Sequence, residues 1–208
     1  MNQRLKLQQN NEGFSLVELI VTILISSVVM LAVVGLLTTG LNLYKSVSAE
    51  TLLQTEGQAA TGRINELVQE AQYLQFYSND GVNDSGCKPL GELVDNKVLL
   101  LMTNEDGGDG WWYYIVWDAG EKLLLLTKEG VARDADNTII NVPSEDDIKE
   151  KASDMISVTQ KKKYLLAQYI DNFVFSKMGT EKLYKVDILL ATGNKQFSAS
   201  QFINERNK

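Results

Sequence analysis

Residues 13–44 read GFSLVELIVTILISSVVMLAVVGLLTTGLNLY, and this stretch decides how the N-terminal part of the chain folds. Glu18 is its single charged residue, and residues 19–44 carry no charge at all. As an α-helix, residues 19–44 would span about 39 Å, whereas the hydrocarbon core of a bilayer is about 30 Å thick. The stretch therefore predicts one membrane-spanning helix, joined to a polar and acidic domain that begins near Lys45.

The sequence around this apolar stretch predicts its orientation and leaves three interpretations of it. Residues 1–12 are polar and include Arg4 and Lys6. Positive charge before an apolar span keeps that end in the cytoplasm, so the bulk of the chain lies outside. A secretory signal cleaved near residues 47–49 is one alternative, but such signals have apolar regions of only about 7–15 residues. A plain membrane anchor is another, and it leaves Glu18 unexplained, because a carboxylate within a spanning helix costs about 2.5–3.5 kcal/mol.

The third interpretation comes from residues 13–20, which resemble the processing motif of type IV prepilins and pseudopilins. The resemblance identifies residues 1–13 as a prepilin leader peptide that ends in Gly13. It implies that a prepilin peptidase cuts between Gly13 and Phe14 on the cytoplasmic side, and that the Phe14 amine is then N-methylated. The segment 14–44 becomes the transmembrane helix, which also forms the filament core in this family.

The same resemblance gives roles to the charged residues of the N-terminus. Arg4 and Lys6 become the basic residues of the leader, and Glu18 stands at the fifth mature position, where the family has a glutamate. In the family model this carboxylate pairs with the Phe14 ammonium of a neighbouring subunit, and pairing offsets much of the cost of burying a charge. Glu18 would then set the register between subunits. The simpler alternative is a carboxylate that favours a helix N-terminus.

The spacing of apolar residues predicts that the helix continues through residues 45–77 as an amphipathic segment. Its apolar stripe consists of Leu53, Ala60, Ile64, Leu67, Ala71 and Leu74. Gly57 and Gly62 weaken this segment and allow either bending or close packing. Gly35 stands where many pilins have a proline, and it permits either local unwinding or close packing of membrane helices.

Residues 78–208 are expected to form a β-rich globular domain. The first three predicted strands form an antiparallel meander that packs one face on the long helix. Ser144 is expected to cap a helix that begins with acidic residues. The predicted strands are 97–103, 111–117, 122–128, 165–170, 173–177, 182–191 and 195–203.

The predicted fold class is therefore α+β, with a long N-terminal helix (transmembrane first half, amphipathic second half) packed on an antiparallel β-sheet domain. The order of the later strands loosely resembles that of larger minor pilins of the PilW type.

The composition argues against several classes of function. The chain has no histidine and one cysteine, Cys87, so Ser-His-Asp or Cys-His catalysis, a His-ligated metal and an intramolecular disulfide are excluded. The net charge of −7 disfavours nucleic-acid binding, which needs a basic face. We expect no enzyme activity, cofactor or metal. Cys87 is interpreted as an inert thiol or a cross-linking one.

Three local patterns have both a structural and a functional interpretation. The acidic turn at residues 105–109 is a solvated turn or a calcium loop, although it lacks the spacing of an EF-hand. The aromatic strand 111–117 fills the core or forms a carbohydrate-binding or stacking surface. The basic run 161–163 is expected to be a solvated loop.

The sequence thus predicts a structural subunit, a minor pilin or pseudopilin of a type IV pilus or related secretion or competence filament. The expected location is the cytoplasmic membrane as a single-pass prepilin with its C-terminal domain outside, and then an extracellular pilus or envelope-spanning pseudopilus. The partners implied by the resemblance are the prepilin peptidase/methyltransferase, other pilins or pseudopilins, and the pilus assembly platform. The alternative is a membrane-tethered extracellular binding module that does not enter a filament.

Overall fold

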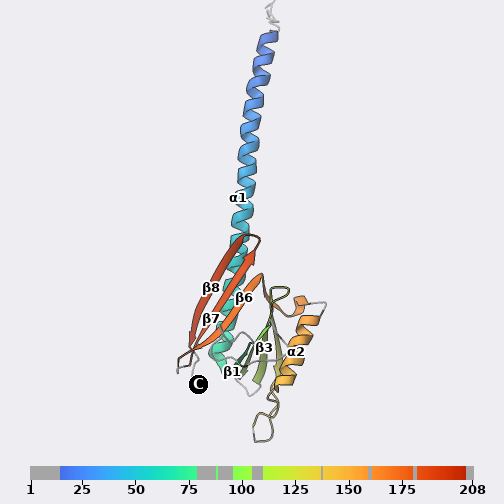
Figure 1. Cartoon of the computed structure of the whole chain (residues 1–208), viewed down its shortest axis with the longest axis vertical. Coiled ribbons are helices and arrows are strands. Elements are labelled where there is room, and N and C mark those ends of the chain that lie inside the picture. The colour runs from blue at the N-terminus through green and yellow to red at the C-terminus, as the bar shows by residue number, and fades with distance from the viewer. Residues whose placement is uncertain are drawn as a thin grey trace, which may run out of the picture. The chain divides into compact units, whose positions relative to one another are not determined.

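The computed structural model describes residues 15–78, 88, 96–104, 110–136, 138–158, 161–179 and 182–204. It divides into two compact units, with the boundary between Val47 and Ser48. Helix α1 (Leu16–Glu70) contributes its first part to one unit and its second part to the other (Figure 1). Several residues of the sequence-based predictions lie outside the described residues: Arg4, Lys6, Gly13, Phe14, Cys87 and the acidic turn 105–109.

The second part of α1 buries one face in the core of the second unit. The buried positions are Leu53, Gly57, Ala60, Thr61, Ile64, Leu67 and Val68, which recur at three- and four-residue intervals. The apolar stripe predicted from Leu53 to Leu67 is confirmed. At Gly57, a Cβ atom would lie 2.9 Å from Cε1 of Phe197 and 3.0 Å from Cδ1 of Leu190, so this glycine serves close packing.

The prediction that the helix extends to Tyr77 is wrong, because α1 ends at Glu70 and Ala71–Tyr77 form strand β1. The register of β1 against its neighbour shifts between Ala71 and Tyr73. An extra residue in a strand keeps positions three apart on the same face, so this bulge imitates helical spacing. Ala71 and Leu74 therefore both pack on the core that α1 enters, as the predicted apolar stripe requires. They do so from strand β1 and not from the helix.

Two antiparallel sheets make up most of the second unit. The first has the order β1-β2-β3-β4-β5, so consecutive strands are neighbours, as in a meander. The second has the order β6-β7-β8 and runs alongside the second part of α1 (Figure 1). The predicted α+β class is confirmed. The strands are β2 (Lys97–Asn104), β3 (Gly110–Asp118), β4 (Leu123–Gly130), β5 (Leu165–Gln168), β6 (Ile170–Met178), β7 (Leu183–Thr192) and β8 (Lys195–Asn204).

Helix α2 (Glu145–Ser157) covers the face of the first sheet that α1 leaves free. Its start is as predicted: the Ser144 hydroxyl accepts a hydrogen bond from the backbone N–H of Asp147, and the Asp147 carboxylate accepts one from the backbone N–H of Ser144. Ile148, Ala152 and Met155 of α2 pack into a second hydrophobic cluster with residues of β2, β3 and β4. One face of the first sheet thus packs on α1, as predicted, and α2 covers the other face.

Candidate functional site

The start of α1 is fixed by a local cap. Ser15 precedes the helix, and its hydroxyl accepts a hydrogen bond of 3.2 Å from the backbone N–H of Glu18. The carbonyl of Ser15 accepts the first helical bond, from the N–H of Leu19 at 3.2 Å. Ser15 therefore occupies the N-cap position and Glu18 the third helical position, where a carboxylate also interacts favourably with the helix dipole. Sequence reasoning missed this cap, although serine followed three residues later by glutamate is its usual pattern.

The first part of α1 exposes apolar side chains on every face. The large hydrophobic residues between Leu16 and Tyr44 are 44–78% exposed. A helix that is apolar all round is buried in a membrane or among other helices in its working state. Among the described residues, α1 is the one helix long and apolar enough to cross a membrane. This property fits the anchoring of a prepilin in the membrane.

Four hydroxyl groups within this apolar segment donate to carbonyls of the helix itself. Thr22 donates to the carbonyl of Leu19 at 2.9 Å, and Ser27 donates to the carbonyl of Leu24 at 2.7 Å. Thr38 and Thr39 likewise donate to carbonyls four residues earlier, at 2.8 and 3.0 Å. Since lipid offers no hydrogen-bond partners, such internal bonds make the segment compatible with the hydrocarbon core. The helix is continuous through Gly35, whose carbonyl accepts the bond from Thr39.

The aromatic strand β3 does not form an open stacking surface. Tyr113 and Trp117 enter the core shared with α1, whereas Trp112 and Tyr114 lie in the cluster beneath α2. All four are at most 8% exposed. The indole N–H of Trp117 donates to the carbonyl of Ile170 at 3.1 Å, which ties the two sheets together. The core interpretation of this strand is therefore confirmed, and that of a stacking platform is wrong.

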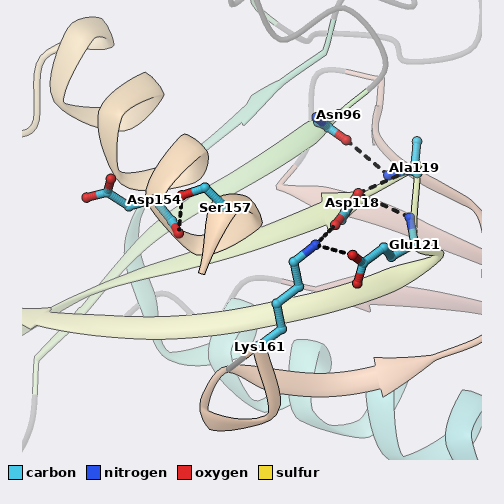
Figure 2. A network of polar contacts seen from close by, with 8 residues as sticks. Asn96, Asp118, Ala119, Glu121, Asp154, Ser157 and Lys161 are labelled. Carbon is cyan, nitrogen blue, oxygen red and sulfur yellow. Dashed lines mark hydrogen bonds and ion pairs between the residues drawn. The ribbon is translucent and has the colours of Figure 1, made fainter. Parts of the chain in front are cut away.

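The basic run 161–163 is not a solvated loop throughout. It forms a short 3-10 helix, η1 (Lys161–Lys163), and the Lys161 side chain is only 15% exposed. Figure 2 shows the Lys161 ammonium between two carboxylates: Nζ lies 2.7 Å from Oδ2 of Asp118 and 3.0 Å from Oε1 of Glu121. The prediction failed because the partners lie about 40 positions earlier in the chain, at the end of β3.

Asp118 is the buried centre of this network, with its side chain 5% exposed. Its Oδ1 atom accepts hydrogen bonds from the backbone N–H groups of Gly120 at 3.0 Å and Glu121 at 3.3 Å. Partial burial favours the neutral amine of Lys161, but the hydrogen bonds to Asp118 and Glu121 outweigh it and raise the pKa of Lys161. The network therefore fixes the β3–β4 turn to the segment that follows α2, and we assign it a structural role.

Comparison with known proteins gives one match, at the N-terminus. Residues 8–34 match the model of the prokaryotic N-terminal methylation motif. No curated protein and no solved structure matches the chain. The matched segment contains both the expected cleavage site and Glu18, and it supports a type IV pilin-like subunit that a prepilin peptidase processes. In the part of the chain that the structure describes, no group of three or more Cys, Asp or Glu side chains is arranged to hold a metal ion.

Proposed function

We propose that the chain is a structural subunit, a minor pilin or pseudopilin, of a type IV pilus or related secretion or competence filament. Cleavage after Gly13 would leave residues 14–208 as the mature subunit, with an N-methylated Phe14 at its start. The methylation-motif match at residues 8–34 supports this processing. The β-rich domain after the helix, whose later strand order loosely resembles that of larger minor pilins of the PilW type, favours a minor subunit over a major one.

The observation that carries the proposal is the apolar surface of α1, which is exposed on all sides from Leu16 to Tyr44. In the prepilin, lipid would cover this surface. In a filament, the corresponding helices of neighbouring subunits would replace the lipid, so the same surface serves both states. The assembly platform would transfer the subunit from one environment to the other.

Glu18 supplies the polar element of this assembly. A carboxylate surrounded by apolar helices is unfavourable unless a cation pairs with it. Processing would create such a cation at the amine of Phe14, four residues before Glu18 in the sequence. We propose that Glu18 pairs with the Phe14 ammonium of a neighbouring subunit and thereby fixes the axial position of each incoming helix.

Two measurements test the proposal. Mass spectrometry of the protein from its native host should find a chain that starts at methylated Phe14, whereas a membrane-tethered module outside any filament would keep residues 1–13. Glu18→Ala should leave processing intact but strongly reduce the protein in sheared filaments. Glu50→Ala, at an exposed position on the same helix, is the matched control and should assemble normally. Normal assembly of Glu18→Ala would refute the pairing role.

A further inference from the structure

The two charges that bound the apolar stretch of α1 are about as far apart as the two surfaces of a bilayer. Glu18 is the last charged residue before residues 19–44, and Lys45 is the first one after them. Both belong to one continuous helix, and Lys45 lies 27 positions after Glu18, so their Cα atoms are about 40 Å apart along its axis. A bilayer is about 30 Å thick in its hydrocarbon core and about 40–45 Å thick with its headgroup regions. A helix close to the membrane normal therefore places both charges among headgroups at once.

The C-terminal end of the apolar stretch carries the side chains of an interfacial anchor. Tyr44 is 72% exposed, and it is the single aromatic residue between positions 15 and 47. Asn42 and Lys45, on either side of it, are exposed as well. Tyrosine is enriched where a membrane meets water, and a lysine next to it can extend its ammonium to the headgroups while its aliphatic stem stays in apolar surroundings.

The distribution of polar groups along α1 agrees with a hydrocarbon boundary at these residues. If the two charges lie equally far from the bilayer centre, the hydrocarbon core covers roughly residues 22–41. Four of the five hydroxyl groups in that range donate to carbonyls of the helix. Outside it, neither the Glu18 carboxylate nor the Asn42 amide finds a hydrogen-bond partner among the described residues. Headgroups and water would supply these partners, whereas hydrocarbon would leave both groups unsatisfied.

We propose that Asn42, Tyr44 and Lys45 bind lipid headgroups on one side of the membrane and thereby hold Glu18 among the headgroups on the other side. The inference rests on the proposed anchoring of the prepilin in a membrane. At this depth the Glu18 carboxylate stays hydrated in the prepilin. The cost of burying it then arises only when the helix enters a filament, where the amine of a neighbouring subunit can pair with it.

The anchor has work to do because the apolar stretch is longer than the hydrocarbon core is thick. A helix with surplus apolar length hides it by tilting. A tilt of about 40° would shorten the separation of Glu18 and Lys45 across the membrane to about 30 Å, and it would draw both charges to the hydrocarbon boundary. Headgroup contacts at Tyr44 and Lys45 oppose this tilt.

The depth of spin labels in vesicles of phosphatidylcholine and phosphatidylglycerol tests the placement. The full chain with Cys87→Ser carries one label, at Leu16→Cys, Leu31→Cys or Leu43→Cys, which are all exposed positions. Electron paramagnetic resonance compares the access of oxygen, which is enriched in hydrocarbon, with that of a water-soluble nickel complex. The Leu31→Cys label should be the deepest, and the other two should lie at headgroup depth. A Leu43→Cys label well inside the hydrocarbon would overturn the proposal.

Substitutions at the anchor give the sharper test. Tyr44→Leu combined with Lys45→Leu should move the Leu43→Cys label about 4 Å towards the bilayer centre, because the helix can then tilt. Tyr44→Trp combined with Lys45→Arg keeps the interfacial chemistry and should leave the label in place. Thr51→Leu is the matched control, because Thr51 is exposed on the same helix beyond the anchor. An unchanged label depth in the double leucine variant would overturn the anchor.

The vesicle measurement is independent of filament assembly, so the two proposals can fail separately. A chain that is never processed or assembled in its host would refute the proposed function, and the depth profile would still test the anchor. A chain that assembles normally, but whose label depth does not respond to the double leucine variant, would refute the anchor alone. Access of the nickel complex to the label at all three positions would show that α1 is not inserted, and it would overturn both.

Discussion

The two glycines in the second part of α1 allow a sharp test of how this helix packs. At Gly57, an added Cβ atom would lie 2.9 and 3.1 Å from two ring carbons of Phe197 and 3.0 Å from Cδ1 of Leu190. At Gly62, five residues later, nothing lies within 4 Å of the added atom. The same substitution, glycine to alanine, therefore meets a crowded surface at one site and open space at the other.

The expected magnitudes follow from two opposing effects. Alanine in place of glycine stabilises a helix interior by about 0.5–1 kcal/mol. Overpacking a close contact destabilises by about 1–3 kcal/mol. Gly62→Ala should therefore raise the free energy of unfolding by about 0.5–1 kcal/mol, because only the first effect applies. The free energy of unfolding of Gly57→Ala should be about 1–3 kcal/mol lower than that of Gly62→Ala, because both effects apply at Gly57.

The assay is urea denaturation of the full chain in mild detergent, followed by tryptophan fluorescence, which reports the second unit because all three tryptophans lie in β3. Phe197→Leu in the Gly57→Ala background should recover part of the loss, since it shortens the side chain that the new methyl group meets. If Gly57→Ala and Gly62→Ala shift the urea midpoint equally, the helix does not pack closely at Gly57 and the reasoning is refuted.

Two further changes test other parts of the second unit by the same assay. Ser144→Ala removes the cap of α2 and should lower the free energy of unfolding by about 1 kcal/mol. Ser144→Asp should retain most of the stabilisation that the cap provides. An unchanged urea midpoint for the alanine variant would contradict the capping role. Lys161→Met leaves Asp118 buried without its cation, although with two backbone donors, and should destabilise by roughly 1–3 kcal/mol. The pKa of Lys161 is raised above 10.5 in the folded state. The contribution of its ion pair to the free energy of unfolding should therefore be fully present below pH 10.5 and should be lost as the pH rises through the raised pKa. A Lys161→Met variant as stable as the wild type at pH 7 would refute the ion-pair assignment.

Local signals were sufficient for many elements of the fold. The strands β2, β3 and β4 follow runs of apolar and aromatic residues between turn-forming segments, and the α2 cap follows a serine before three acids. Such patterns depend on residues that are close in sequence, so they can be recognised without knowledge of the tertiary structure. The end of α1 was missed for a local reason too, because the bulge at the start of β1 reproduces the spacing of a helix.

The candidate sites also differ in whether local sequence or the tertiary structure reveals them. The candidate processing and assembly segment was predicted from the order of Gly13, Phe14 and Glu18 before an apolar run, and the methylation-motif match at residues 8–34 covers these residues. A pocket lies between α2 and β3, and it was not predicted, because it needs β3 and a helix that begins 27 residues after the end of β3 to meet. No spacing within either segment indicates that their side chains share one surface.

The sequence by itself determined the long apolar helix, its single acid and the likeness of its start to a prepilin. These depend on composition and order within one continuous stretch, and that stretch needs no other part of the chain to take its form. Only the tertiary structure decided which faces of β3 are covered, where Lys161 finds its partners, and that Gly57 faces Phe197. Those outcomes arise from contacts between distant segments, whose free energy depends on how the whole second unit packs.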